Sequence, residues 1–126
     1  GELKHMGDPI RLTDGPTRIT VATKQEAKYA LDVTAYKGFD LFLVVYEIAG
    51  GSPGMTVQMT TSMQNVSDDA ALWLPLGSAF TTVTTANTAE TISISAGSLR
   101  YIRWEVSFPG TTASTTFELT GIARPG

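Results

Sequence analysis

The sequence predicts an all-β protein: a single-domain, two-sheet antiparallel β-sandwich, jelly-roll-like, with eight or nine strands. Three observations predict this class. Polar and apolar residues alternate with a period of two in most segments, as in half-buried strands. Turn-forming residues separate these segments every ~8–12 residues. Threonine, which favours strands, occurs 19 times among 126 residues. An immunoglobulin-like sandwich is the alternative that this pattern leaves open.

The alternation places nine candidate strands along the chain. The clearest one includes Met55, Val57 and Met59, which alternate with threonine and glutamine. Short helical turns are expected only near residues 24–28 and within the polar loop 65–72. The expected strands are residues 9–13, 17–23, 28–36, 39–49, 55–64, 72–82, 89–95, 99–108 and 114–123.

The strand at residues 39–49 differs from the others because both of its faces are apolar. One face carries Phe39, Leu41, Leu43 and Val45, and the other carries Phe42, Val44, Tyr46 and Ile48. We expect a central strand whose second face is covered by a loop or by a neighbouring subunit. In the last strand, Gly121 interrupts the pattern and predicts a bulge or a close backbone approach.

Length and composition place these strands in one domain, because domains typically contain about 100–150 residues. Residues 1–5 resemble a cloning leader ahead of a natural start at Met6, so the domain is expected to span residues 6–126. That leader holds the single histidine of the sequence, His5, and cysteine is absent. We therefore expect no thiolate or serine–histidine chemistry, no cofactor and no enzymatic activity.

Charge and hydropathy argue against two classes of partner. The net charge is −3 and the isoelectric point is near 5.0, whereas nucleic-acid binding requires a basic surface. The longest apolar run, at residues 41–46, is far shorter than the ~20 residues that span a bilayer. We expect neither nucleic acid nor membrane as a partner.

Carboxylates are the acid–base groups that merit attention. Asp68 and Asp69 lie in a polar loop and are weak candidates for calcium, which takes six to eight oxygen ligands; the alternative is a solvated loop with a turn-initiating aspartate. Glu47, Glu105 and Glu118 lie within strands. A close pair of them would suit glycoside hydrolysis, but outward-facing glutamates paired with arginines are the expectation.

Aromatic residues suggest one further kind of site. Trp104 lies on the apolar face of its strand and is expected in the core. Trp73 lies next to Pro75, either in the core or in an exposed loop. With Tyr36, Tyr46 and Tyr101 it would form a platform that contacts a ligand or partner, because exposed aromatic rings stack on the apolar faces of sugars.

Three stretches resemble small β-sandwich virion proteins of tailed bacteriophages. They are VQMTTSMQN at 57–65 followed by WLPLGS at 73–78, LRYIRW at 99–104, and TFELTGIAR at 116–124. The resemblance implies a non-enzymatic structural protein of the virion, in particular a capsid decoration protein. Such a protein binds the major capsid protein or other virion subunits and assembles as a homo-oligomer, for example a trimer.

The same order of segments, from a tryptophan segment through the YIR strand at 101–103 to a last edge strand, also resembles discoidin-type and other galactose-binding-like jelly rolls. This second resemblance implies a carbohydrate-binding module that uses loops at one end of the sandwich. Both functions stay open at the level of sequence.

Overall fold

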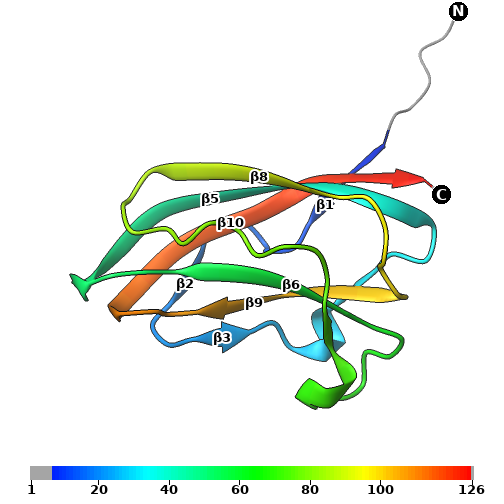
Figure 1. The fold of residues 1–126 in the computed structure, drawn as a ribbon, viewed down its shortest axis with the longest axis horizontal. Helices are drawn as coiled ribbons and strands as arrows, with labels where there is room; N and C mark the ends of the chain where they lie inside the picture. Colours follow the sequence, from blue (N-terminus) through cyan, green and yellow to red (C-terminus); the bar gives the residue numbers. More distant parts are fainter. Residues whose placement is uncertain (1–6, 126) are drawn as a thin grey trace, which may run out of the picture.

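Residues 7–125, which the computed structural model describes, form two antiparallel sheets packed face to face (Figure 1). Sheet A contains β1 (Asp8–Arg11), β2 (Thr17–Ile19), β5 (Tyr36–Ser52), β8 (Thr88–Ile94) and β10 (Thr111–Pro125). Sheet B contains β3 (Thr23–Lys24), β4 (Leu31–Asp32), β6 (Thr56–Ser62), β7 (Leu74–Pro75) and β9 (Tyr101–Ser107). The predicted β-sandwich is confirmed. The expected leader at residues 1–5 lies outside the described residues.

The strand order is that of a jelly roll. β1 and β2 both pair with β10, and β3 and β4 both pair with β9, so each of these short pairs acts as one strand. If β1 with β2, and β3 with β4, are each counted as one strand, the described residues form eight strands in chain order. The strand order is then 1-8-3-6 in sheet A and 2-7-4-5 in sheet B. The two sheets exchange strands as two Greek keys do in a jelly roll, which decides against the immunoglobulin-like alternative.

The core fills the space between the sheets. Alternation along each strand directs every second side chain inward, as the sequence predicts. The Trp104 and Phe117 rings meet edge to face, with centroids 5.2 Å apart, so the expectation that Trp104 is a core residue is confirmed. The inward side chains of β5, β6, β9 and β10 include Phe39, Leu41, Leu43, Val45, Val57, Met59, Ile102, Trp104, Val106, Phe117 and Leu119.

Two of the expected strands are much shorter than predicted, and a third, at 17–23, is divided between β2 in sheet A and β3 in sheet B. In place of a strand at 28–36, the chain forms the 3-10 turn η1 (Ala27–Tyr29) and then β4. The Asp32 carboxylate accepts hydrogen bonds from the Thr34 backbone N–H at 3.0 Å and from its hydroxyl at 2.6 Å. This turn ends β4, because a side chain takes the backbone donor that a neighbouring strand would need.

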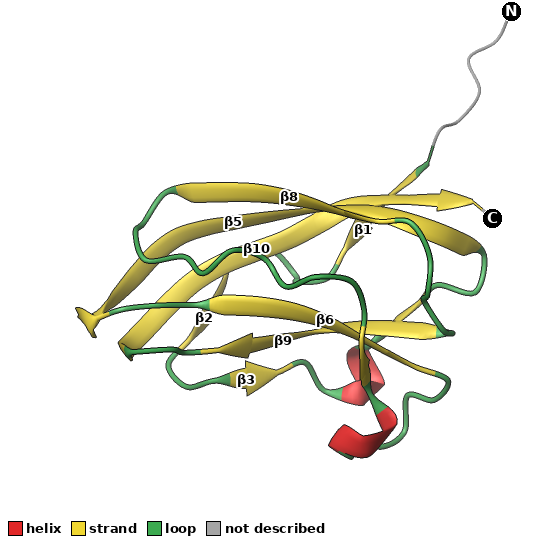
Figure 2. Ribbon diagram, in the orientation of Figure 1, coloured by secondary structure: helices red, strands yellow, loops and turns green. Residues whose placement is uncertain are grey.

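The expected strand at 72–82 is an irregular edge of sheet B, of which only β7 is regular. Its backbone meets β6 at intervals, with Leu76 N donating to Met59 O at 2.9 Å and Phe80 N donating to Val57 O at 2.9 Å. Gly77 has a positive φ of 69°, which takes the chain out of the extended region. The turn predicted in the loop 65–72 is present as the 3-10 turn η2 (Ala70–Leu72). Figure 2 shows η1 and η2 side by side at one end of sheet B.

The outer face of β5 corrects one prediction. A β-bulge places Thr116 opposite Glu47 but Phe117 opposite Val45, so Tyr46 is the extra residue on β5. Beyond the bulge the alternation is reversed: Tyr46 and Glu47 are both exposed, and Ile48 packs against the core. Ile48 therefore does not share the outer face with Phe42, and no loop within residues 7–125 covers that face, since Phe42 is 42% exposed.

Gly121 makes the close approach that the sequence predicts. A Cβ atom at this position would lie 2.5 Å from the carbonyl oxygen of Asp40 on the neighbouring strand β5. Only glycine allows β10 and β5 to pair at this distance, so the expectation of a close backbone approach is confirmed.

Candidate functional site

The aromatic residues expected to form a platform lie apart. Trp73 is 4% exposed and packs under η2 on the outer side of sheet B. Its indole N–H donates to Ser67 O at 2.9 Å, and its ring stacks on the Arg103 guanidinium at 4.2 Å. Trp73 therefore presents no open face to a ligand.

The three tyrosines each occupy a different part of the surface. Tyr36 and Tyr46 lie at two separate positions of β5, where their hydroxyls donate to Asp8 and Glu118, each at 2.7 Å. Both hydrogen bonds raise the pKa of the tyrosine, because the carboxylate stabilises the protonated hydroxyl. Tyr101 lies on sheet B, with the Arg100 guanidinium 5.1 Å from its ring centroid. These side chains are not brought together into one platform with Trp73.

Asp68 and Asp69 both have structural partners. The Asp68 Oδ1 atom accepts from Ala27 N at 2.6 Å and from Arg103 Nη1 at 2.9 Å. The Asp69 Oδ1 atom accepts from Ala71 N at 3.0 Å and so caps η2, which is the turn-initiating role that the sequence analysis gave as the alternative. Within residues 7–125, no group of three or more acidic, histidine or cysteine side chains is placed to hold a metal ion.

The strand glutamates lie on both sheets. Glu47 and Glu118 lie on the neighbouring strands β5 and β10 of sheet A, and Glu105 lies on sheet B. Glu105 Oε2 is 3.7 Å from Nη2 of Arg103 on the same strand, so this glutamate does contact an arginine, but not across strands as expected. Glu118 accepts from Tyr46 and not from an arginine.

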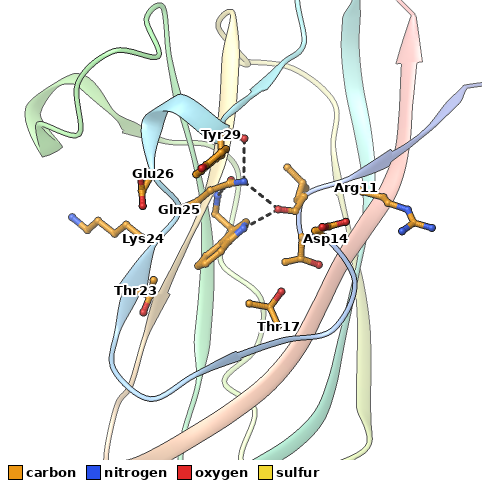
Figure 3. A pocket seen from close by; sticks show the side chains of 11 residues that line it. Arg11, Asp14, Thr17, Thr23, Lys24, Gln25, Glu26 and Tyr29 are labelled. Atoms are coloured by element: carbon orange, nitrogen blue, oxygen red, sulfur yellow. Dashed lines mark hydrogen bonds between the residues drawn. The ribbon is translucent and has the colours of Figure 1, made fainter.

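A groove of about 610 Å³ opens between the edges of the two sheets (Figure 3). Its volume falls within the range of about 300–1,000 Å³ that is usual for small-molecule sites. One wall belongs to β1, β2 and the turn between them, and the other to β3 and η1. Trp104 lies between the two walls. The groove is lined by Arg11, Leu12, Thr13, Asp14, Thr17, Thr23, Lys24, Gln25, Glu26, Tyr29 and Trp104.

Gln25 ties the two walls together. Its side-chain Nε2 donates to Leu12 O and to Tyr29 O, each at 3.2 Å, and its Oε1 accepts from Trp104 N at 3.3 Å. The Trp104 indole N–H also donates to Leu12 O, at 2.9 Å. Figure 3 shows the bonds from the Gln25 amide, one on the side of Tyr29 and one to the opposite wall. The spacing of the walls is therefore fixed by hydrogen bonds, as preorganised binding sites require.

An ion pair between the buried Arg103 and the exposed Asp68 supports the same wall from the outer side of sheet B. Arg103 is fully buried on the outer side of sheet B, and its Nη1 donates to Gln25 O at 3.0 Å as well as to Asp68. Asp68 in turn holds Ala27 N. The Nε and Nη2 atoms of Arg103, and Thr60 Oγ1 on the paired strand β6, have no hydrogen-bond partner. The backbone at 25–27 is thus fixed by a pair that does not itself line the groove.

The groove is not predictable from the sequence because its residues follow no recognisable motif. The two walls come from residues 11–17 and 23–29, which carry charges of both signs. Only the fold shows that these segments face one another across Trp104. Gln25, which connects them, has no sequence signal that separates it from an ordinary surface glutamine.

A second notable surface lies on the outer side of sheet A. Phe42 and Tyr46 on β5 are 42% and 41% exposed, and Ile122 on β10 is 42% exposed. Val44 between the first two is half-buried. We call these four residues the sheet-A outer face. Because β5 lies between β10 and β8, this apolar stripe follows the middle of the sheet and not its edge.

The described residues hold no helix long and apolar enough to cross a membrane. In comparisons with known proteins, no family model matches the sequence, and no curated protein matches it. One solved structure, described as "Bacillus endospore appendages form a novel family of disulfide-linked pili", is 12% identical and aligns over 99% of this chain and 97% of that chain, with a TM-score of 0.38. A likeness this weak carries no argument about the function of the chain.

Proposed function

We propose that this protein is a non-enzymatic structural protein of a bacteriophage virion, a capsid decoration protein that acts through protein–protein contacts. Its partners would be the major capsid protein or other virion subunits, and further copies of this chain in a homo-oligomer such as a trimer. The bacteriophage setting rests on the resemblance of residues 57–65, 73–78, 99–104 and 116–124 to small virion proteins. The protein-binding role rests on the exposed apolar residues of the sheet-A outer face.

The sheet-A outer face has the properties of an interaction surface. Large apolar side chains on the outside of a protein, grouped together and bordered by polar residues, mark interaction surfaces. Phe42 lies between Thr120 on β10 and Thr91 on β8, so at this residue the apolar stripe is bordered by uncharged hydroxyls. A surface with few charges at its centre suits a protein partner, since charged residues are depleted at the cores of interfaces.

Two of the charged groups nearby already have partners within the chain. Asp40 accepts hydrogen bonds from Arg124 and from the Ser93 hydroxyl, and Glu118 accepts one from the Tyr46 hydroxyl. A partner that covers this face would therefore meet Asp40 with its charge matched by Arg124, and unpaired charges are the costly groups to desolvate. Binding that adds contacts across neighbouring shell subunits stabilises the assembly by mass action.

The test is binding to a capsid. A major capsid gene beside the gene for this chain would identify the shell, and particles assembled from that capsid protein are then the probe. We expect the chain to co-sediment with these particles at a fixed saturating ratio, and Phe42→Asp to abolish co-sedimentation. Val66→Asp is the matched control, because Val66 is 88% exposed on a different surface. Failure of the unaltered chain to bind, or equal binding by both variants, would contradict the proposal.

Carbohydrate binding is a second candidate function, favoured by a separate observation. The expected platform of Trp73, Tyr36, Tyr46 and Tyr101 does not support it, since these residues lie apart. The groove does, because it combines a suitable volume with hydroxyl, carboxylate and cationic groups on walls of fixed spacing. This function does not use the sheet-A outer face, so the two proposals can hold or fail independently.

A further inference from the structure

We propose that the groove between the sheet edges binds an uncharged saccharide, with one sugar ring resting against Tyr29. This inference rests on carbohydrate binding as the second candidate function, and adds to it the place, the charge class of the ligand and the residues that contact it. None of the aromatic residues expected to form the platform lines this groove.

The charges of the lining favour an uncharged ligand. Arg11 and Lys24 contribute two positive charges and Asp14 and Glu26 contribute two negative charges, so the lining sums to zero. Arg11 and Lys24 extend outward on opposite sides of the groove in Figure 3. Glu26 is also paired with Lys28 at 3.4 Å. An anionic ligand would meet Asp14 without a compensating excess of cations, and a cationic ligand would meet the two basic side chains.

The polar groups match the hydrogen-bonding needs of sugar hydroxyls. Thr17 Oγ1 donates to Gly15 O at 3.2 Å, and Thr23 Oγ1 donates to Val21 O at 2.7 Å. Because the proton of each hydroxyl is already donated to a backbone carbonyl, both hydroxyl oxygens are left to act as hydrogen-bond acceptors. Asp14 is an acceptor and Lys24 is a donor. A sugar hydroxyl both donates and accepts, so it can satisfy groups of each kind on the two walls.

Tyr29 supplies the aromatic contact that saccharide sites use. It is 64% exposed at the rim of the groove, and the Lys28 ammonium lies 5.1 Å from its ring centroid. Its backbone is fixed on both sides: Tyr29 N donates to Glu26 O at 2.9 Å, and Tyr29 O accepts from Gln25. A large exposed ring on a fixed backbone loses little entropy when it stacks on a ligand.

The other occupant that a groove between two sheet edges invites is an extended peptide added as a strand. The edges here argue against it. β2 has three residues and β3 has two, whereas strands usually have about five or six residues. Such short edges offer too few aligned backbone groups to hold an added strand.

The experiment is a titration of the isotope-labelled full chain, followed by amide chemical shifts. The neutral probes are lactose, maltotriose and chitotriose, and the charged probes are 3′-sialyllactose and the glucosamine trimer. We expect at least one neutral probe to give saturable shifts at residues 12–17 and 23–29, and lactose to shift these amides more than 3′-sialyllactose does. An uncharged hexapeptide of alternating threonine and valine tests the added strand.

Variants then test the contacts. Tyr29→Ala should weaken binding of the active probe about two- to tenfold, the range expected for loss of an aromatic contact. Tyr46→Ala is the matched control, because this exposed tyrosine lies on sheet A away from the groove. Thr17→Val keeps the shape of the side chain and removes its acceptor, so it should also weaken binding.

The outcomes distinguish carbohydrate binding in general from the binding of an uncharged saccharide in this groove. Groove shifts with charged saccharides only would overturn the inference of an uncharged ligand and leave carbohydrate binding in place. No saturable groove shift with any of the five saccharides, or shifts with the hexapeptide alone, would overturn both. Equal effects of Tyr29→Ala and Tyr46→Ala would overturn the assigned contact residue.

Discussion

The guanidinium of Arg103, fully buried on the outer side of sheet B, donates a 2.9 Å hydrogen bond to Asp68, whose side chain is 65% exposed. The pair joins β9 to the loop before η2. Trp73 covers the guanidinium at 4.2 Å, and Gln25 O accepts from the same nitrogen as Asp68. One arginine thus holds together the two 3-10 turns and one wall of the groove.

Removal of Asp68 should destabilise the fold more than removal of its neighbour. Asp68→Ala removes the hydrogen-bonded counter-charge of the buried Arg103 and leaves only the longer ion pair with Glu105, at 3.7 Å. We expect the free energy of unfolding to fall by about 2–4 kcal/mol. The matched control is Asp69→Ala, which removes only the cap of η2 and should cost about 1 kcal/mol. Urea denaturation followed by tryptophan fluorescence measures both values.

A double variant tests whether the ion pair with Arg103 is the reason for the loss of stability in Asp68→Ala. Arg103→Met keeps an apolar stem against Trp73 and removes the buried charge, together with two nitrogens that have no hydrogen-bond partner. In the Arg103→Met background, Asp68→Ala should therefore cost much less than in the unaltered chain. If Asp68→Ala costs the same in both backgrounds, the ion pair is not the source of its effect.

Much of the fold could be predicted from the sequence because alternation reports burial directly. The strands with one apolar face, such as residues 55–64 and 99–108, were placed within two residues of β6 and β9. The errors arose where a local feature interrupts a strand, either a side chain that bonds to the backbone or an extra residue that forms a bulge. Asp32 bonds to the backbone of Thr34 and ends β4, and the extra residue Tyr46 turns Ile48 inward. Neither effect changes the apolar–polar pattern from which strands are predicted.

The candidate sites were less predictable, for a physical reason. Arg103 occupies an outward position on its strand, where an arginine is expected to be exposed, yet η2, Trp73 and the segment at 25–27 cover it. Burial there depends on a loop that folds back from another part of the chain. The groove depends in the same way on which strand edges face one another. Such tertiary relationships leave no periodic signal in the sequence.

Gly121 should tolerate no side chain. In Gly121→Ala the new methyl group would lie 2.5 Å from Asp40 O and 3.0 Å from Leu41 Cδ2, so β10 and β5 must move apart. We expect a loss of about 1–3 kcal/mol in the free energy of unfolding, as for other overpacked positions. Gly51→Ala is the control, because its nearest neighbour is a side-chain atom, Thr111 Oγ1 at 3.3 Å. Equal losses in the two variants would rule out the close approach as the cause.

The stability of the sheet-A end near Asp40 should depend on acidity. Hydrogen bonds from Arg124 and Ser93 hold the pKa of Asp40 below its usual value of 3.8. Because the folded state lowers this pKa, the carboxylate stabilises the fold fully above pH 3.8, and the contribution is lost as the pH falls through the lower, folded value.

Asp40→Asn should therefore lower the thermal midpoint slightly at neutral pH and progressively less on acidification. Arg124→Gln removes the same pair from its other side, so it should show the same convergence with the unaltered chain. The effect should be small and weakened by salt, since both side chains are partly exposed. A difference that persists unchanged well below pH 3.8 would show that the ionised carboxylate is not responsible.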